Sequence, residues 1–189
     1  MQILVQTVAG IQIGFWLFWF ILAIRFRSTY KRRQSNRFLL PVLPFLVLAG
    51  IVLSEGLSPD LLQWRIIPDG LAPGLLGIIV TILGLGFAVW ARLHLGRNWG
   101  ARPGIKVDHK LIRTGPYRFV RNPIYTGILF GYAGTAIVIG EFWAFVLILF
   151  VLAVLLGKIR AEEKFLLEEF GEAYVQYKKE VKGLIPCIF

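Results

Sequence analysis

Residues 123–157 read PIYTGILFGYAGTAIVIGEFWAFVLILFVLAVLLG, two apolar runs that are separated only by Gly140 and Glu141. A helix that crosses a membrane upright needs about 20 apolar residues, and each run is slightly shorter than that. A break this short between two apolar runs is typical of helices that are antiparallel neighbours. The stretch therefore predicts a helical hairpin inside a membrane.

Three further apolar runs precede the hairpin, at residues 3–24, 38–54 and 70–93. The hydrophobic fraction of the chain is 57%, above the about 45–50% that is usual in soluble domains. We therefore expect an all-α integral membrane protein with about five transmembrane helices. Small residues in the third and fourth spans would let neighbouring helices approach closely. They are Gly74, Gly77, Gly84, Gly86, Gly127, Gly131 and Gly134.

The basic residues are confined to a few places along the chain. All but Arg65 of the 21 Lys and Arg residues lie within residues 25–37, 92–121 and 158–182. Short cytoplasmic loops retain basic residues, so these segments are expected in the cytosol and the N-terminus outside. The outer loops would then hold Arg65 and four acids, which are Glu55, Asp60, Asp69 and Glu141.

These patterns predict one membrane domain over residues 1–189. Residues 1–94 would form its three N-terminal spans. Residues 95–189 would supply a basic loop, the hairpin and a polar cytosolic helix at 158–181. The lipid bilayer is the first expected partner, because apolar spans with flanking basic residues suit anionic headgroups.

Several classes of function find no support in the chain. The net charge of +10 is explained by headgroup contacts, and no groove-reading motif suggests nucleic-acid binding. With two histidines, one cysteine and neither HExxH nor CxxC, no metal site is expected. Gly84-Leu-Gly86 lies within a span instead of between a strand and a helix, so it cannot cradle a dinucleotide phosphate.

Residues 109–125, HKLIRTGPYRFVRNPIY, form the first stretch with candidate site residues. Residues 114–116 predict a turn. Asn122 and Pro123 predict a helix start, with Asn as N-cap and Pro at the first helical position. Tyr117 and Tyr125 would lie at the level of the headgroups. A helix cap with an aromatic belt explains all of these residues without any ligand.

The second stretch is KIRAEEK, residues 158–164, directly after the last span. Lys158 and Glu162 are four residues apart and share a helix face, and Arg160 and Glu163, three apart, do the same. A carboxylate here would face the start of the helix at Asn122. Such groups could hold a zwitterion. The acids and the lysine farther along, Glu168, Glu169, Glu172 and Lys179, are expected to be solvated ion pairs.

The sequence Arg121-Asn-Pro-Ile-Tyr125-Thr-Gly127, followed by Glu162-Glu163, resembles a known signature. It is similar to the Arg-His-Pro-x-Tyr-x-Gly … Glu-Glu pattern of the isoprenylcysteine carboxyl methyltransferase and phospholipid methyltransferase superfamily. The resemblance covers residues from about 95 to the C-terminus. The five-span layout is similar to that of the short prokaryotic members.

This resemblance implies that S-adenosylmethionine binds at the cytosolic end of the last spans. The residues that it assigns to the cofactor are His109, Lys110, Leu111, Ile112, Gly115, Tyr117, Arg121, Asn122, Pro123, Tyr125, Glu162 and Glu163. Glu162 would bind the ammonium group or the ribose. Lys158, or Arg160 in its place, would orient the carboxylate of the methyl acceptor, and Tyr125 is expected to take part in the transfer.

The chain departs from the family pattern at two positions. Asn122 stands where histidine is usual, and asparagine can hydrogen-bond but cannot titrate near neutral pH. Lys158 stands where an arginine is expected, so the bidentate fork is lost and the substrate class is left open.

The favoured function is carboxyl O-methylation of an amphipathic, isoprenylcysteine-like acceptor, either a small molecule or a prenylated protein. A carboxylate, with a reference pKa of about 4, is ionised at neutral pH and needs no general base. The alternatives are an N-methyltransferase for phospholipids or other amines, an NADPH-dependent enzyme similar to the sterol reductases, and a non-catalytic membrane scaffold.

Overall fold

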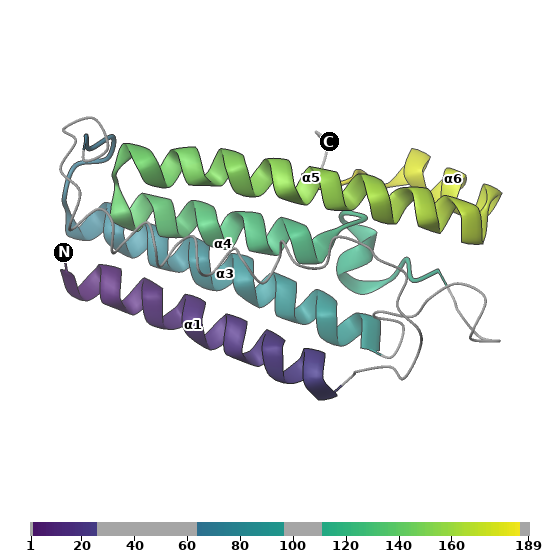
Figure 1. Cartoon of the computed structure of the whole chain (residues 1–189), viewed down its shortest axis with the longest axis horizontal. Coiled ribbons are helices and arrows are strands. Elements are labelled where there is room, and N and C mark those ends of the chain that lie inside the picture. The colour runs from purple at the N-terminus through teal and green to yellow at the C-terminus, as the bar shows by residue number, and fades with distance from the viewer. Residues whose placement is uncertain (1, 26–63, 97–110, 186–189) are drawn as a thin grey trace. The chain divides into compact units, whose positions relative to one another are not determined.

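The computed structural model describes residues 2–25, 64–96 and 111–185. The elements in chain order are α1 (Gln2–Arg25), α3 (Leu71–Leu95), the 3-10 turn η2 (Gly115–Arg118), α4 (Pro123–Ile139), α5 (Phe142–Phe170) and α6 (Glu172–Glu180), as Figure 1 shows. Within these ranges the regular structure is entirely helical, and the only β-type contact is an isolated bridge between Arg65 and Glu141. The expected all-α class is confirmed.

Three of the helices, at Gln2–Leu22, Leu71–Leu95 and Phe142–Phe170, are long and apolar enough to cross a membrane. Helix α4 is apolar but shorter, with 17 residues. The predicted spans at residues 3–24, 70–93 and 123–139 are therefore helices with nearly the expected bounds. The predicted span at residues 38–54 lies outside the described residues, so the count of five spans and their orientation remain predictions.

The polar helix predicted over residues 158–181 is divided between two elements, the end of α5 and α6. Helix α5 continues without a break to Phe170, and α6 begins only after Gly171. Residues 158–170 are mostly good helix formers and contain neither Gly nor Pro, so the backbone has no reason to stop where the hydropathy changes. Gly171 has φ 49, a value that glycine adopts at little cost, and it ends the helix instead.

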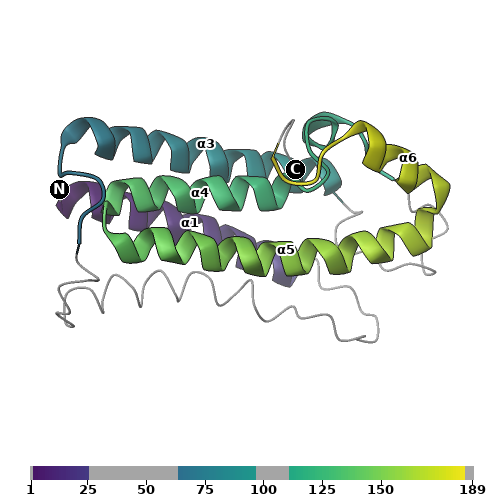
Figure 2. The same ribbon diagram turned by 90° about the horizontal axis from the view of Figure 1, so that it is seen from above.

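The chain divides into two compact units, Met1–Leu83 with Leu129–Val154, and Gly84–Ile128 with Leu155–Phe189. In the first unit α1 and the adjoining parts of α3, α4 and α5 run side by side, as Figures 1 and 2 both show. The turn between α4 and α5 is fixed by Gly140, whose carbonyl oxygen accepts hydrogen bonds from the backbone of Ile66 and Ile67 at 2.8 and 3.1 Å. The predicted hairpin is therefore present.

Close approach of α3 and α4 through small residues is also observed. A Cβ at Gly77 would lie 2.7 Å from the carbonyl oxygen of Gly134, and a Cβ at Gly127 would lie 2.6 Å from the nitrogen of Ala88. Because these contacts are with backbone atoms, a larger residue would push the helices apart. Gly86, by contrast, has no such neighbour within 4 Å, so the expectation fails for that glycine.

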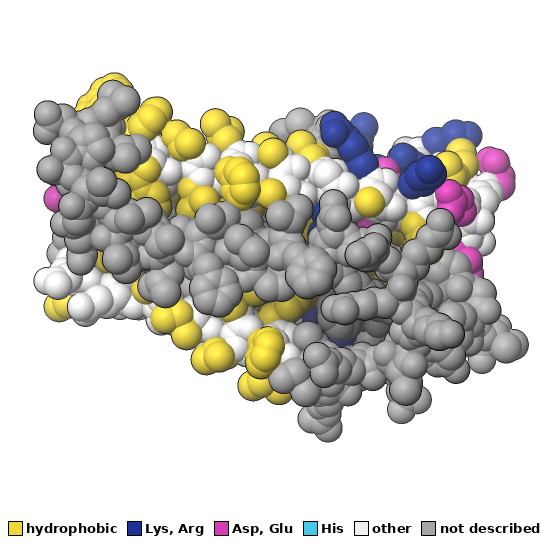
Figure 3. All heavy atoms as spheres, viewed as in Figure 1, with side chains coloured by type: hydrophobic (Ala, Val, Ile, Leu, Met, Phe, Trp, Pro, Cys, Tyr) yellow, Lys and Arg dark blue, Asp and Glu magenta, His cyan; other side chains and the backbone are white. Residues whose placement is uncertain are grey.

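Large apolar side chains cover much of the described surface of the helices. Leu17, Phe20, Leu83 and Leu149 are each more than half exposed. In Figure 3 hydrophobic side chains line the helices, and charged side chains gather over α6 and the adjoining end of α5. Extended apolar surface of this kind is rare on soluble monomers and is what lipid-facing helices present.

Candidate active site

The candidate site lies in the second unit, where the chain enters α4 close to the end of α5. The turn predicted at residues 114–116 is present and opens η2. Gly115 has φ +60, and a Cβ at this position would lie 2.7 Å from His94 Cε1. Nε2 of His94 is 2.9 Å from Thr114 Oγ1, and its ring stacks on Tyr117 with the centroids 6.5 Å apart. His94, to which the sequence assigned no role, therefore supports the turn from the end of α3.

Tyr117 is buried and both of its polar groups are used within the protein. Its hydroxyl donates to the carbonyl oxygen of Ala91 at 3.5 Å, and its own carbonyl oxygen accepts a hydrogen bond from the Tyr177 hydroxyl at 2.6 Å. Burial raises the pKa of Tyr117 well above its usual value, so the hydroxyl stays protonated. Its predicted contact with the cofactor remains a prediction.

Arg121 and Glu163 form a nearly buried ion pair. Nε and NH2 of Arg121 both donate to Glu163 Oε1, at 3.0 and 2.7 Å, and Nζ of Lys178 donates to Glu163 Oε2 at 2.7 Å. The side chains of Arg121 and Glu163 are 11% and 14% exposed. Both oxygens of this carboxylate are thus engaged. The partners of Glu163 therefore come from elements other than α5.

Residues 181–184, which we call the C-terminal strap, are bound along the start of α4. The guanidinium NH1 of Arg121 donates to the carbonyl oxygen of Val181. The backbone N–H of Arg121 donates to the carbonyl oxygen of Lys182 at 2.8 Å. The backbone N–H and the side-chain Nδ2 of Asn122 both donate to the carbonyl oxygen of Gly183 at 3.0 Å. The next contact along the strap is from Thr126 Oγ1 to the carbonyl oxygen of Leu184 at 2.6 Å.

Asn122 precedes the first residue of α4 as predicted, but its side-chain amide is directed to the strap. Capping would use its amide oxygen and stays a prediction, whereas its amide nitrogen anchors Gly183. Sequence reasoning missed the strap altogether. Its only signal in the sequence was Gly183, a glycine beyond the polar helix.

Tyr125, Glu162 and Lys158 are brought together, as the resemblance implied. The buried Tyr125 hydroxyl donates to Glu162 Oε1 at 2.6 Å, and Lys158 Nζ lies 3.8 Å from the same oxygen. The Glu162 side chain is 47% exposed, whereas that of Lys158 is 14% exposed. Glu162 is therefore held by Tyr125 while about half of its side chain is exposed, whereas Glu163 is nearly buried.

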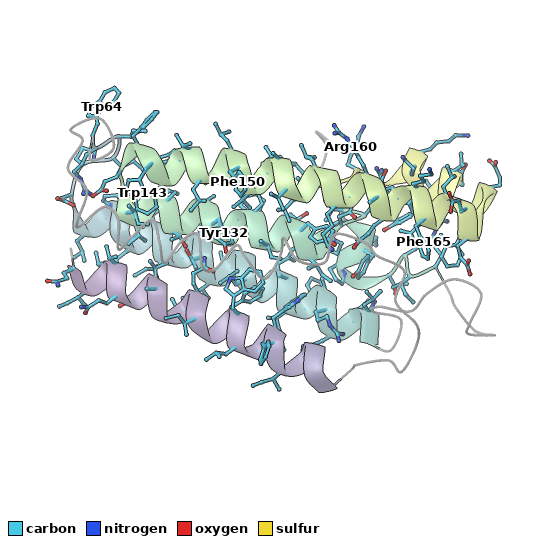
Figure 4. The ribbon with its side chains drawn as sticks, viewed as in Figure 1. Trp64, Tyr132, Trp143, Phe150, Arg160 and Phe165 are labelled. Atoms are coloured by element: carbon cyan, nitrogen blue, oxygen red, sulfur yellow. The ribbon has the colours of Figure 1, made fainter. Side chains whose placement is uncertain are left out.

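The remaining candidates are placed less favourably or are not described. Arg160 is exposed, and Figure 4 shows it pointing away from the neighbouring helices. Leu111 and Ile112 are partly buried and Pro123 is buried. His109 and Lys110 lie outside the described residues.

The donor set of this cluster fits the polar part of S-adenosylmethionine. A half-exposed carboxylate attracts an ammonium or a ribose hydroxyl, and that cofactor carries both. Within residues 2–25, 64–96 and 111–185 there is no group of three or more His, Cys, Asp or Glu residues that would hold a metal ion.

Similarity to known proteins points to the same region. The chain is 33% identical over 116 residues to the protein-S-isoprenylcysteine O-methyltransferase of Saccharomyces cerevisiae. This match covers 60% of this chain and 48% of the yeast protein. It is 38% identical over 82 residues to the protein of the same name in Schizosaccharomyces pombe. This match covers 43% of this chain and 35% of the relative. The matched part thus spans half or less of the length of these relatives.

A solved structure of the eukaryotic intramembrane Ras methyltransferase ICMT (isoprenylcysteine carboxyl methyltransferase) resembles this chain with a TM-score of 0.60 at 24% identity. The match covers 82% of this chain and 55% of the other, and it shows a common fold. Residues 73–173 match the model of the phospholipid methyltransferase family, an interval that includes Tyr125, Lys158 and Glu162. The chain therefore belongs to the phospholipid methyltransferase family.

Proposed function

We propose that this protein is an S-adenosylmethionine-dependent methyltransferase of the membrane, and that it methylates the carboxylate of an amphipathic, isoprenylcysteine-like acceptor. Membership of the family and the names of the two fungal relatives support the proposal. The observation that carries it is the cluster of Tyr125, Glu162 and Lys158, in which an accessible carboxylate and an ammonium lie together beyond the apolar part of α5.

Each residue of the cluster has a distinct task in this reading. Glu162 accepts hydrogen bonds from the ammonium or the ribose hydroxyls of the cofactor. Tyr125 holds Glu162 in place with a short hydrogen bond, and Lys158 attracts the acceptor carboxylate. When bound, S-adenosylmethionine supplies a methyl group that passes from its sulfonium sulfur to an acceptor oxygen, and the bonding electron pair stays on sulfur. The chain contributes positioning and exclusion of water, which can be worth several kcal/mol.

A carboxylate acceptor suits a site without a histidine at position 122. The acceptor is ionised at neutral pH, so no group has to remove a proton from it. Asn122 cannot titrate, and its amide nitrogen is already bound to Gly183. The absence of a titrating side chain at this position therefore does not oppose carboxyl methylation.

Amine N-methylation of a phospholipid is the second candidate, favoured by the description of the family model. An ammonium acceptor must first lose a proton, which requires a base. His109, the candidate histidine of the preceding loop, lies outside the described residues. The identity of the methylated product separates the two candidates.

We place the site at the cytosolic face, because the basic segments 92–121 and 158–182 flank it. Single cysteines introduced at Ser58 and Thr114 test this orientation in a variant that lacks Cys187. A membrane-impermeant thiol reagent should label them from opposite sides of sealed vesicles. Labelling of both from one side would refute the five-span topology.

The proposed activity is tested by transfer of radiolabelled methyl from S-adenosylmethionine in proteoliposomes. A prenylcysteine analogue and phosphatidylethanolamine are offered separately, and the label is tested for release by base. Base-labile label on the prenylcysteine supports a methyl ester, whereas base-stable label on the lipid supports N-methylation. Arg160→Ala is the matched control for Lys158→Ala, since Arg160 points away from the cluster. Binding of NADPH without binding of S-adenosylmethionine would favour the reductase alternative.

A further inference from the structure

The C-terminal strap is tied to the start of α4 through consecutive carbonyl groups. Those of Val181, Lys182, Gly183 and Leu184 each accept a hydrogen bond from Arg121, Asn122 or Thr126. Gly183 and Leu184 are buried. An unpaired buried carbonyl is costly, so the strap is held there by its own backbone as well as by the side chains that it meets.

The residues that bind the strap are neighbours in sequence of the candidate site residue Tyr125. Asn122 directly precedes α4, Thr126 follows Tyr125 within it, and Tyr125 donates to Glu162. Arg121 precedes them and binds Glu163, the next residue of α5. The start of α4 and the end of α5 are thus joined by two adjacent links, and the strap is fastened to the residues that make them.

Asn122 is the residue that couples the strap to this arrangement. Both of its nitrogen atoms donate to one carbonyl oxygen, and the residue is 9% exposed. The same residue's carbonyl oxygen accepts the hydrogen bond from Thr126 N at 3.0 Å that starts α4. Loss of Nδ2 would remove one of the two donors to the Gly183 carbonyl and leave only the backbone N–H of Asn122 on it.

We propose that Asn122 is a positioning residue that holds the C-terminal strap against the start of α4 and thereby keeps Tyr125 and Glu162 in the geometry that binds the cofactor. It acts through its N–H donor and not through a proton transfer or a contact with the cofactor. The effect of Asn122 on cofactor binding, the second half of this inference, rests on the proposed function. Its first half, that Asn122 holds the strap, concerns only the fold.

The test compares Asn122→Asp with Gln176→Glu. The first change removes the donor and turns a carboxylate oxygen toward the Gly183 carbonyl, whereas the second makes the same chemical change on exposed α6. Thr126→Val is a second strap variant that adds no charge, so the test survives if Asn122→Asp fails to fold. Each purified protein is measured for trypsin cleavage after Lys182 by intact mass, and for binding of S-adenosylmethionine by calorimetry.

We expect Asn122→Asp and Thr126→Val to raise cleavage after Lys182 about tenfold, as the loss of one buried hydrogen bond implies. We expect both to weaken S-adenosylmethionine binding by a similar factor, while Gln176→Glu changes neither. Unchanged cleavage would overturn the role of Asn122 in holding the strap. Increased cleavage with unchanged affinity would overturn its effect on the site.

Two further outcomes are informative. Weaker binding of S-adenosylmethionine without increased cleavage would mean that Asn122 contacts the cofactor directly, against the proposal. A wild-type protein that binds no S-adenosylmethionine would refute the proposed function and the second half of this inference with it. The cleavage data would then still decide whether Asn122 holds the strap, so the two failures are distinguishable.

Discussion

The adjacent residues Glu162 and Glu163 are predicted to respond in opposite ways to the same substitution. Glu162 is half exposed and makes a short hydrogen bond with Tyr125, whereas Glu163 is nearly buried between Arg121 and Lys178. Glutamine is almost isosteric with glutamate and removes only the charge and one acceptor oxygen. The pair Glu162→Gln and Glu163→Gln therefore separates ligand binding from structural support.

For Glu162→Gln, the affinity for S-adenosylmethionine should fall with little change in stability. A hydrogen bond to a charged group contributes about 1.5–3 kcal/mol, which corresponds to about a 10- to 150-fold increase in Kd. The ion pair with Lys158 adds little to stability, because an exposed pair contributes at most about 1 kcal/mol. Its Tm should therefore fall by no more than about 2–4 °C.

For Glu163→Gln, stability should fall instead. Three hydrogen bonds from Arg121 and Lys178 reach this carboxylate, and the loss of its charge leaves a nearly buried guanidinium without a counter-ion. Because Lys178 is 42% exposed and glutamine retains one acceptor, we expect a loss of only about 2 kcal/mol. This corresponds to a decrease in Tm of about 4–8 °C for a chain of this size.

Both variants are measured in detergent by calorimetric titration with S-adenosylmethionine and by thermal unfolding. An unchanged Kd for Glu162→Gln would remove Glu162 from the cofactor site. If Glu163→Gln lost affinity but unfolded at the wild-type temperature, the assignment of the two glutamates would have to be exchanged.

Three further predictions concern single residues. Tyr125→Phe should reduce turnover in the methyl-transfer assay without lowering Tm, and wild-type turnover would leave Tyr125 only a packing role. Gly115→Ala should lower Tm because its positive φ and its contact with His94 leave no room for a Cβ, whereas Gly157→Ala, with open space, should not. Burial raises the pKa of Tyr177 to about 12 from its unfolded value near 10, so stability should fall as the pH rises through that interval. Tyr177→Phe should reduce this fall in alkaline unfolding measurements, and an identical pH profile would contradict the assignment.

The bounds of the helices could be predicted closely from the sequence where they depend on the length of an apolar run. Apolar length decides whether a segment spans, and this predicted α3 and α4 nearly to the residue. The same criterion does not set the end of α5. Hydropathy changes at Lys158, but the backbone responds to helix propensity and continues to Phe170.

Contacts within one helix could also be predicted. Lys158 and Glu162 are one turn apart, and the structure places Nζ and Oε1 3.8 Å from each other. The partners that Glu163 has in the fold could not be predicted in this way. Arg121 and Lys178 reach Glu163 from other elements of the fold, and the guanidinium of Arg121 makes two hydrogen bonds with it.

The sequence by itself determined the all-helical class, the hairpin at Gly140 and the turn at residues 114–116, because each depends on local hydropathy or backbone preference. Only the tertiary structure decided that Tyr125 meets Glu162, that Glu163 is closed off by Arg121, and that Asn122 binds Gly183. These pairs are separated by 37, 42 and 61 positions along the chain. Periodicity carries no information over such separations, since the partner of a polar group is chosen by which donors and acceptors the packed helices bring within hydrogen-bond distance.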